Sequence, residues 1–317
     1  MFQQRSLLQF PNGIILFERG WLSSNNILMR GRHGCALIDS GYATHAPQTL
    51  TLVTKALQGQ PLELLLNTHL HSDHCGGNAA LQAHYPELQT RIPPGHARFV
   101  QPWDPVALSY APTGQICPPF SYSATLQPNT EIALGDQLWQ VHAAPGHDPH
   151  SVILFEPQSR LLISADALWE NGFGVVFPEL DGFDAFTEVA QTLDVIEALA
   201  PSLVIPGHGA AFADVAEALA RARRRLDSFA QAPQKHRRYA AKVLLKFKLL
   251  EVQRIVQADM LQWAQATPLL AQIYQSSDVA GQPFEAWVSA LLDELVRSGA
   301  ASRDQQTLCN DNAAAKH

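Results

Sequence analysis

The apolar residues of this chain fall into short runs separated by segments with helical spacing. Runs bounded by turn residues predict strands at residues 13–17, 26–29, 35–39, 62–67, 131–134, 138–142, 151–155, 161–164 and 203–205. Apolar positions three or four residues apart predict helices at residues 46–57, 77–85, 183–199 and 210–230. Strands that precede and surround helices in this order indicate an α/β protein with two sheets flanked by helices.

The pattern becomes mostly helical after residue 235, with amphipathic helices predicted at residues 239–250 and 283–298. Gln231, Ala232 and Pro233 mark the boundary between the two kinds of pattern. We therefore predict a first domain over residues 1–230, a small helical domain over residues 235–309 and a disordered tail over residues 310–317.

Residues 98–124 follow neither pattern, because five prolines and five aromatic side chains interrupt them. We predict that this segment is a loop lining the mouth of a pocket. The alternative is a covering segment that packs on the sheet.

The composition is that of a soluble globular protein with enough apolar material for a core, since 46% of the residues are hydrophobic and 16% are charged. No apolar run is long enough to span a bilayer, and the N-terminus lacks the apolar stretch of a signal peptide. We therefore expect a cytoplasmic protein. The four cysteines are scattered without a CxxC pair, so the sequence indicates neither a disulfide scaffold nor a thiolate zinc site.

The net charge of −7 is unevenly distributed. Residues 221–254 contain eleven Lys and Arg against two acidic residues, a net +9, so the remainder carries −16. This basic block is consistent with binding of an anion or RNA. The alternative is a solvated helix face that pairs with acidic neighbours.

The hexapeptide that begins at His69 contains three imidazoles and a carboxylate. Neutral imidazole and carboxylate are ligands that suit zinc, manganese or iron. His69 and His71 project to the same side if the segment is extended. Asp73 and His74 follow as the chain turns, so they can face a second ion.

Three later residues share a position directly after a short apolar strand, and two of them follow a glycine. They are His147, Asp166 and His208. The ends of buried strands are where α/β proteins collect their site residues, and glycine lets the backbone turn tightly there. These three residues are therefore candidate partners of the hexapeptide.

The order of these motifs resembles the metallo-β-lactamase-fold hydrolase superfamily over about residues 7–230. The matching motifs are His69-x-His71-x-Asp73-His74, Pro145-Gly146-His147, Ser164-Ala165-Asp166 and Pro206-Gly207-His208-Gly209. The resemblance implies an αββα sandwich whose site lies at one edge between the two sheets.

The resemblance also implies two divalent metal ions, Zn²⁺ with iron or manganese as alternatives. His69, His71 and His147 would bind one ion; Asp73, His74 and His208 would bind the other, with Asp166 between them. The commonest true β-lactamases have cysteine at the position of Asp166. Aspartate there resembles the glyoxalase II, lactonase and RNA-processing branches instead.

Two ions that share a water lower its pKa enough to supply hydroxide at neutral pH. We therefore expect a hydrolase in which a bridging hydroxide attacks the substrate and Asp73 passes a proton to the leaving group. The apolar segment 169–177, together with Trp103 and Tyr110, is a candidate pocket wall and favours a small acyl substrate such as an ester, thioester or lactone.

Two other functions are alternatives. The C-terminal region is similar to the small winged-helix-like domain of some family members, one branch of which cleaves RNA, and the basic block would then contact phosphates. A binding or signalling protein with weak catalysis is the second alternative, and the C-terminal helices are also candidates for a homodimer contact.

Two residues near the motifs have less specific signals. His150 is either a neighbour of the metal ligands or a capping or surface residue, and Cys75 is best interpreted as a small buried thiol.

Overall fold

The computed structural model describes residues 9–279 and 281–311, and the chain divides into two compact units. The first unit contains residues 9–104 and 117–226, and the second contains residues 105–116 together with those from 227 onward. The hydrophobic pattern did not predict that residues 105–116 belong to the second unit while the segments on both sides of them belong to the first. Residues 105–116 fall inside the Pro-rich and aromatic segment.

The first unit contains two sheets. The six-stranded sheet has the order β1 (Ile14–Phe17), β2 (Asn26–Gly31), β3 (Gly34–Ile38), β4 (Leu64–Leu66), β5 (Gln89–Ile92) and β6 (Ala124–Thr125). The five-stranded sheet has the order β11 (Leu203–Pro206), β10 (Leu161–Ala165), β9 (Val152–Glu156), β8 (Gln137–Ala143) and β7 (Thr130–Leu134). Pairing is parallel from β3 to β6 and between β10 and β11, and antiparallel elsewhere.

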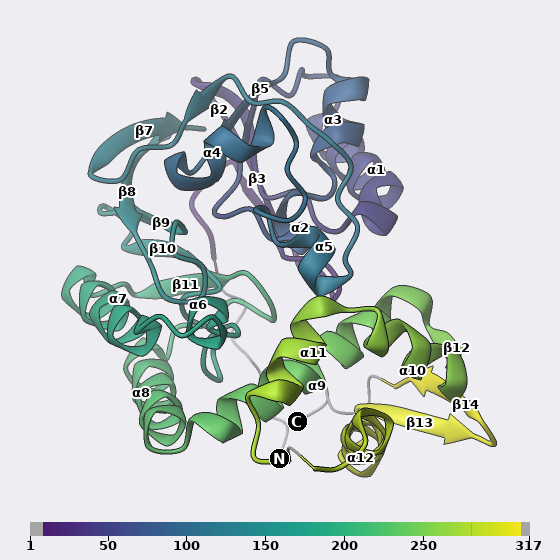
Figure 1. The fold of residues 1–317 in the computed structure, drawn as a ribbon. Coiled ribbons are helices and arrows are strands. Elements are labelled where there is room, and N and C mark those ends of the chain that lie inside the picture. Colours follow the sequence, from purple (N-terminus) through teal and green to yellow (C-terminus); the bar gives the residue numbers. More distant parts are fainter. Residues whose placement is uncertain (1–8, 280, 312–317) are drawn as a thin grey trace, which may run out of the picture. The chain divides into compact units, whose positions relative to one another are not determined.

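Helices flank these sheets. They are η1 (Ala43–His45), α1 (Ala46–Leu57), α2 (Ser72–Cys75), α3 (Asn78–His84), α4 (Pro94–Val100), α6 (Phe177–Leu180), α7 (Ala185–Leu199) and the first part of α8 (Val215–Gln231). Figure 1 shows α1 and α3 beside the six-stranded sheet and α7 beside the five-stranded sheet.

Successive side chains of the six-stranded sheet enter two different cores because a strand alternates its faces. Ile38 of β3 lies in the core between the sheets with Trp139 of β8. Its neighbour Leu37 points the other way and packs with Val53 of α1 and Leu81 of α3. Both faces of the sheet are therefore covered, and the expected two-sheet α/β fold is confirmed.

Most predicted elements occur within a few residues of their expected bounds, and α1 has the expected ones. The helix expected from residue 210 begins only at Val215. The reason is that Phe212 pairs with Val204, and each backbone N–H donates to the carbonyl of the other residue at 2.9–3.0 Å. An extended residue in this bridge does not have helical dihedral angles, so the helix starts after it.

The second unit is mainly helical. Its helices are α5 (Tyr110–Thr113), the end of α8, α9 (Pro233–Val252), α10 (Gln257–Gln265), α11 (Pro268–Gln275) and α12 (Phe284–Arg297). A small sheet of β12 (Arg254–Val256), β14 (Thr307–Asn310) and β13 (Ala301–Asp304) joins them. The mainly helical pattern predicted after residue 235 is confirmed, and a strand after α9 pairs with a hairpin near the end of the described chain.

Asn310, the first residue of the predicted tail, belongs to β14, and residues 312–317 lie outside the described residues. Within residues 9–279 and 281–311, every helix is too short or too polar to cross a bilayer.

Candidate metal centre

The candidate ligands follow strands that end at the same edge of the two sheets. β3 and β4 are parallel and end in register, and Asp39 and the segment 67–74 come next. β10 and β11 likewise end together, directly before Asp166 and the turn that carries His208. Because neighbouring parallel strands deliver their next residues to one place, positions far apart in the chain meet here.

Backbone hydrogen bonds tie these strand ends to one another across the sheets. Val152 N at the start of β9 donates to Thr68 O at 2.9 Å, and Asn25 N donates to Gly207 O at 2.6 Å. His147 stands on the connection between β8 and β9, so the first of these bonds brings it toward the end of β4.

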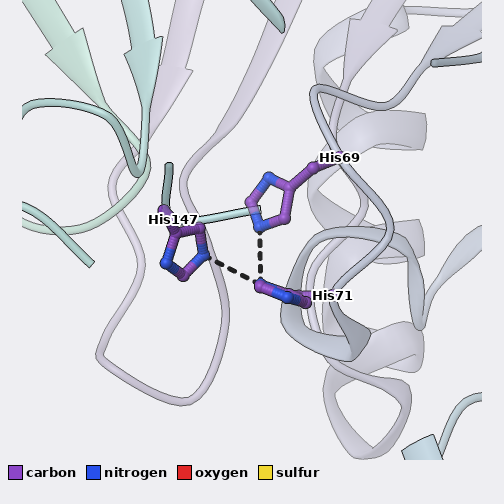
Figure 2. A group of neighbouring side chains, drawn as sticks. All are labelled: His69, His71 and His147. Atoms are coloured by element: carbon purple, nitrogen blue, oxygen red, sulfur yellow. Dashed lines mark hydrogen bonds between the residues drawn. The ribbon is translucent and has the colours of Figure 1, made fainter. Parts of the chain in front are cut away.

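Three imidazoles meet at the first candidate ion position (Figure 2). The Nδ1 atom of His71 lies 3.0 Å from His69 Nε2 and 2.8 Å from His147 Nε2. The three residues have ligand atoms within 4.8 Å of one another, and His69 and His147 are buried. This is the set that the family resemblance assigned to one ion.

The second set is built by the helical turn α2 and the loop after β11. Asp73, His74 and His208 have ligand atoms within 4.8 Å of one another, and Asp73 Oδ2 lies 3.1 Å from His208 Nε2. Asp166 lies between the two sets. Its Oδ1 is 3.4 Å from His74 Nε2, whereas its Oδ2 is 3.4 Å from His147 Nε2 and 3.8 Å from His208 Nε2.

The hydrogen bonds on the outer side of the histidines test whether this set fits a metal. His147 Nδ1 is 2.5 Å from the carbonyl oxygen of Val175, which can only accept, so this nitrogen carries the proton and Nε2 presents a lone pair. His74 Nδ1 donates to Asp39 Oδ2 at 2.8 Å, and its Nε2 is buried without a hydrogen-bond partner. Lone pairs that face one another in a buried site fit a divalent cation.

Asp39 accepts the hydrogen bonds that lie behind the candidate ligands, although the sequence analysis did not single it out. It is buried and accepts hydrogen bonds from Thr68 N (2.9 Å), Thr68 Oγ1 (2.8 Å) and His74 Nδ1. Thr68 Oγ1 also lies 3.2 Å from His69 Nδ1 and can accept its proton. The rule that found Asp166, a polar residue directly after an apolar strand, would also have found Asp39.

Burial and neighbouring charge set the protonation of the histidines. Burial, and then the surrounding imidazoles, lower the pKa of His69 well below its ordinary value and that of His71 to about 4. Burial alone would lower the pKa of His74 too, but Asp39, Asp166 and Asp73 raise it well above its ordinary value. His69 and His71 are therefore neutral at pH 7 and suited to bind a metal, while the carboxylates around His74 favour a positive charge.

The two acidic candidates are ionised at neutral pH. Burial opposes the charged form of Asp166, but His208 and His74 lower its pKa well below the ordinary value. The pKa of Asp73 is lowered in the same way, by His74 and His208 against the effect of burial. Both are therefore available as anionic ligands.

Glycine is required beside the candidate bridge for reasons of space. A Cβ atom on Gly207 would lie 2.1 Å from Asp166 Oδ1, and one on Gly174 would lie 2.4 Å from His147 Nδ1. The sequence suggested that glycine lets the chain turn here. The structure adds that Gly207 leaves room for the carboxylate of Asp166.

Aromatic side chains surround the candidate centre. Trp21 stacks on His208 at 5.5 Å, Trp169 meets the same ring edge-on at 5.5 Å, and Phe177 lies edge-on to His71 at 4.9 Å. Trp169 and Phe177 come from the predicted wall segment. Trp21 was missed because it stands alone in a polar loop, and it is 45% exposed.

Four other side chains were singled out from the sequence, namely His150, Cys75, Trp103 and Tyr110. The backbone N–H of His150 donates to Asp148 Oδ1, and its ring packs edge-on against His96. The buried Cys75 thiol contacts His71 O at 3.3 Å and lies 3.8 Å from Cys117 Sγ. Trp103 packs on Phe120, and Tyr110 is a buried residue of the second unit.

Curated relatives of this chain include two proteins with named activities. A hydroxyacylglutathione hydrolase of Anaeromyxobacter dehalogenans is 31% identical over 65% of this chain and 70% of its own length. An acyl-coenzyme A thioesterase of Gallus gallus is 27% identical over 60% of this chain and 75% of its own length. The chain spans between 46% and 75% of the length of the curated relatives it matches, and about half of the first of them.

Comparison with solved structures and family models agrees with the fold. A metallo-beta-lactamase family protein of Thermus thermophilus superposes with a TM-score of 0.57 at 18% identity, and the match covers 94% of this chain and 98% of that one. The model of the metallo-beta-lactamase superfamily matches residues 19–208, more than half of the chain. The chain therefore belongs to the metallo-beta-lactamase superfamily.

Proposed function

We propose that this protein is a metal-dependent hydrolase that cleaves a small acyl substrate, most specifically a thioester, with two divalent ions. The observation that carries the proposal is Asp166, whose buried carboxylate lies between the two sets, 3.4 Å from His147 of the first and 3.4–3.8 Å from His74 and His208 of the second. Zn²⁺ is the ion we propose, because a site of imidazole and carboxylate ligands suits it.

In this proposal His69, His71 and His147 hold one ion and Asp73, His74 and His208 hold the other, with Asp166 shared. When bound, the ions supply a water acidic enough to give hydroxide and a positive charge for the substrate carbonyl oxygen. The carbonyl carbon gains an oxygen, the carbon–sulfur bond breaks, and the thiol leaves with a proton.

Asp73 is the residue we propose to handle that proton. Its carboxylate is ionised, and Oδ2 lies 3.1 Å from His208 Nε2, beside the ligand atoms of the second set. It can accept a proton from the attacking water and give it to the departing sulfur. Asp73→Asn should lower kcat by about 10²–10⁴-fold, and full turnover of this variant with both ions bound would exclude the proton-transfer role.

The choice of a thioester rests on the aromatic surroundings of the centre and on two relatives. Trp21, Trp169 and Phe177 provide apolar surface beside the candidate ligands. The two relatives bear the names hydroxyacylglutathione hydrolase and acyl-coenzyme A thioesterase. Because Asp166 replaces the cysteine of the commonest true β-lactamases, we do not propose antibiotic hydrolysis.

The RNA alternative lacks support because the basic block is largely occupied by contacts within each unit. Arg223 pairs with Asp194 and Glu197, while Arg238 and Lys242 both pair with Glu294. Other members of the block also have partners: Arg221 and Arg224 with Glu217, Lys248 with Glu251, and Arg254 with Asp304. This pairing with acidic neighbours is the alternative that the charge pattern left open.

The test is a panel of thioester, lactone and phosphodiester substrates against protein whose metal content is measured. Thioester turnover that is lost with a chelator and restored by Zn²⁺ would support the proposal. Metal-loaded protein that hydrolyses only phosphodiesters, or none of the substrates, would contradict it.

A further inference from the structure

The indole of Trp169 contacts the carboxylate between the two candidate ion positions. Trp169 Nε1 donates to Asp166 Oδ1 at 3.2 Å. The same oxygen faces His74 Nε2 at 3.4 Å, so the indole approaches the carboxylate beside a proposed ligand contact. An indole N–H is a donor only, so it orients the carboxylate without competing for a cation.

The loop after Asp166 folds back and holds Trp169 in place. Trp169 N donates to Gly172 O at 2.7 Å, and the two residues form an antiparallel bridge. Gly174 N returns to donate to Asp166 O at 2.9 Å. Val175 of the same loop accepts from His147 Nδ1, so one short segment supports two proposed ligands.

Two arginines of α8 hold the tip of this loop from outside the metal centre. Arg221 Nε donates to Glu170 O at 2.8 Å. Arg225 Nη1 lies 3.4 Å from Asn171 O, and its guanidinium stands over the ring of Phe173. A continuous series of contacts thus runs from α8 through the loop to Trp169 and Asp166.

We propose that Trp169 is a positioning residue that fixes the rotamer of Asp166, and with it the orientation of the carboxylate between the two sets of histidines. The proposal rests on the proposed two-ion centre. A carboxylate without such a donor can rotate about its terminal torsion, which is broad. Loss of an outer hydrogen bond of this kind typically costs about 10–100-fold in metal affinity.

The variant Trp169→Phe tests this, because it keeps an aromatic ring against His208 and removes the N–H. Zn²⁺ affinity and stoichiometry are measured by competition with a chromophoric chelator, and the visible spectrum of the Co²⁺-loaded protein reports the geometry of the ligands. We expect affinity for at least one ion to fall about tenfold or more, with a changed Co²⁺ spectrum. Trp139→Phe is the matched control, since it makes the same change at a buried indole whose Nε1 has no hydrogen-bond partner, and its Zn²⁺ affinity should stay within about twofold of the wild type.

Equal Zn²⁺ affinities for wild type and Trp169→Phe would overturn the inference and leave the proposed function standing. A wild-type protein that binds no ion would instead overturn the proposed function. If urea unfolding of the metal-free variant shows a damaged fold, the double variant Arg221→Ala/Arg225→Ala replaces it. That variant loosens the loop without touching the ligands, and we expect a loss of about threefold or more in affinity, whereas an unchanged affinity would contradict the proposal.

Discussion

Asp39→Asn is the substitution whose effect the structure defines most closely. Asp39 accepts three hydrogen bonds in a buried site, two from Thr68 and one from His74 Nδ1. The asparagine has the same shape, and its oxygen can still accept from Thr68 N. Its NH₂ group then faces the Thr68 hydroxyl and the N–H of His74, so two donors oppose each other.

His74 can relieve this conflict by carrying its proton on Nε2 instead of Nδ1. That tautomer points a proton at Asp166, where the proposed ion needs a lone pair. We expect Zn²⁺ affinity at one of the two positions to fall about 10–100-fold, as for other outer partners of metal ligands. This corresponds to about 1.4–2.7 kcal/mol.

The free energy of unfolding should fall as well. A hydrogen bond to a charged group contributes about 1.5–3 kcal/mol, and a buried donor without a partner costs about 1–3 kcal/mol. We therefore expect Asp39→Asn to lose about 2–4 kcal/mol in the metal-free protein, measured by urea unfolding. Asp39→Ala should lose more, because it leaves all three donors without their partner.

The matched control is Asp136→Asn, which removes the same charge from an exposed pair with Arg32. Its stability should change by less than about 0.5 kcal/mol, and its metal affinity should not change. If Asp39→Asn is folded and binds two ions with Kd values within about twofold of the wild type, the argument from the tautomer of His74 is wrong.

Three further predictions follow from single contacts. Gly207→Ala places a methyl group 2.1 Å from the proposed bridging oxygen and should weaken Zn²⁺ binding by more than about tenfold, whereas Gly20→Ala, which meets nothing within 4 Å, should not; equal chelator-competition curves would contradict this. In metal-free protein, the low pKa of His71 means that the unfolded chain takes up a proton before the folded one does. Stability to urea should therefore decline by up to about 3 kcal/mol as the pH falls from 6.5 toward 4, and His71→Gln should flatten that decline. Glu294→Gln should cost about 0.5–1 kcal/mol at pH 7, because Arg238 lowers the pKa of this carboxyl, and the difference should vanish as the pH falls below 4.5 through the folded pKa; a loss that persists at pH 3 would refute the ion pair as its cause.

The elements of the first unit were predictable because their signals are local. A strand such as β4 is an apolar run buried on both faces, and α1 has a clear 3.6-residue period with a proline in its first turn. The seven candidate ligands were predictable for a related reason, because each follows a strand end where site residues collect. Their proximity is observed, and their role as ligands stays a prediction.

Other features depend on contacts between residues remote in the chain, for which the local pattern has no signal. The start of α8 was predicted too early because Phe212 pairs with a strand. The assignment of residues 105–116 to the second unit was missed because their helix, α5, is only one turn long. The basic block was ambiguous until Arg238 was seen beside Glu294, 56 residues away. Charge along the chain does not specify which partner a side chain reaches.

The sequence by itself indicated the family, the order of the strands along the chain and the candidate ion ligands, since these depend on composition, periodicity and motif spacing. Only the tertiary structure decided which nitrogen of each histidine faces inward, that Asp39 orients His74, and that Trp169 contacts Asp166. Those properties are set within an ångström by hydrogen bonds between segments that meet only when parallel strands end at a common edge. They are also the features on which the proposed chemistry depends.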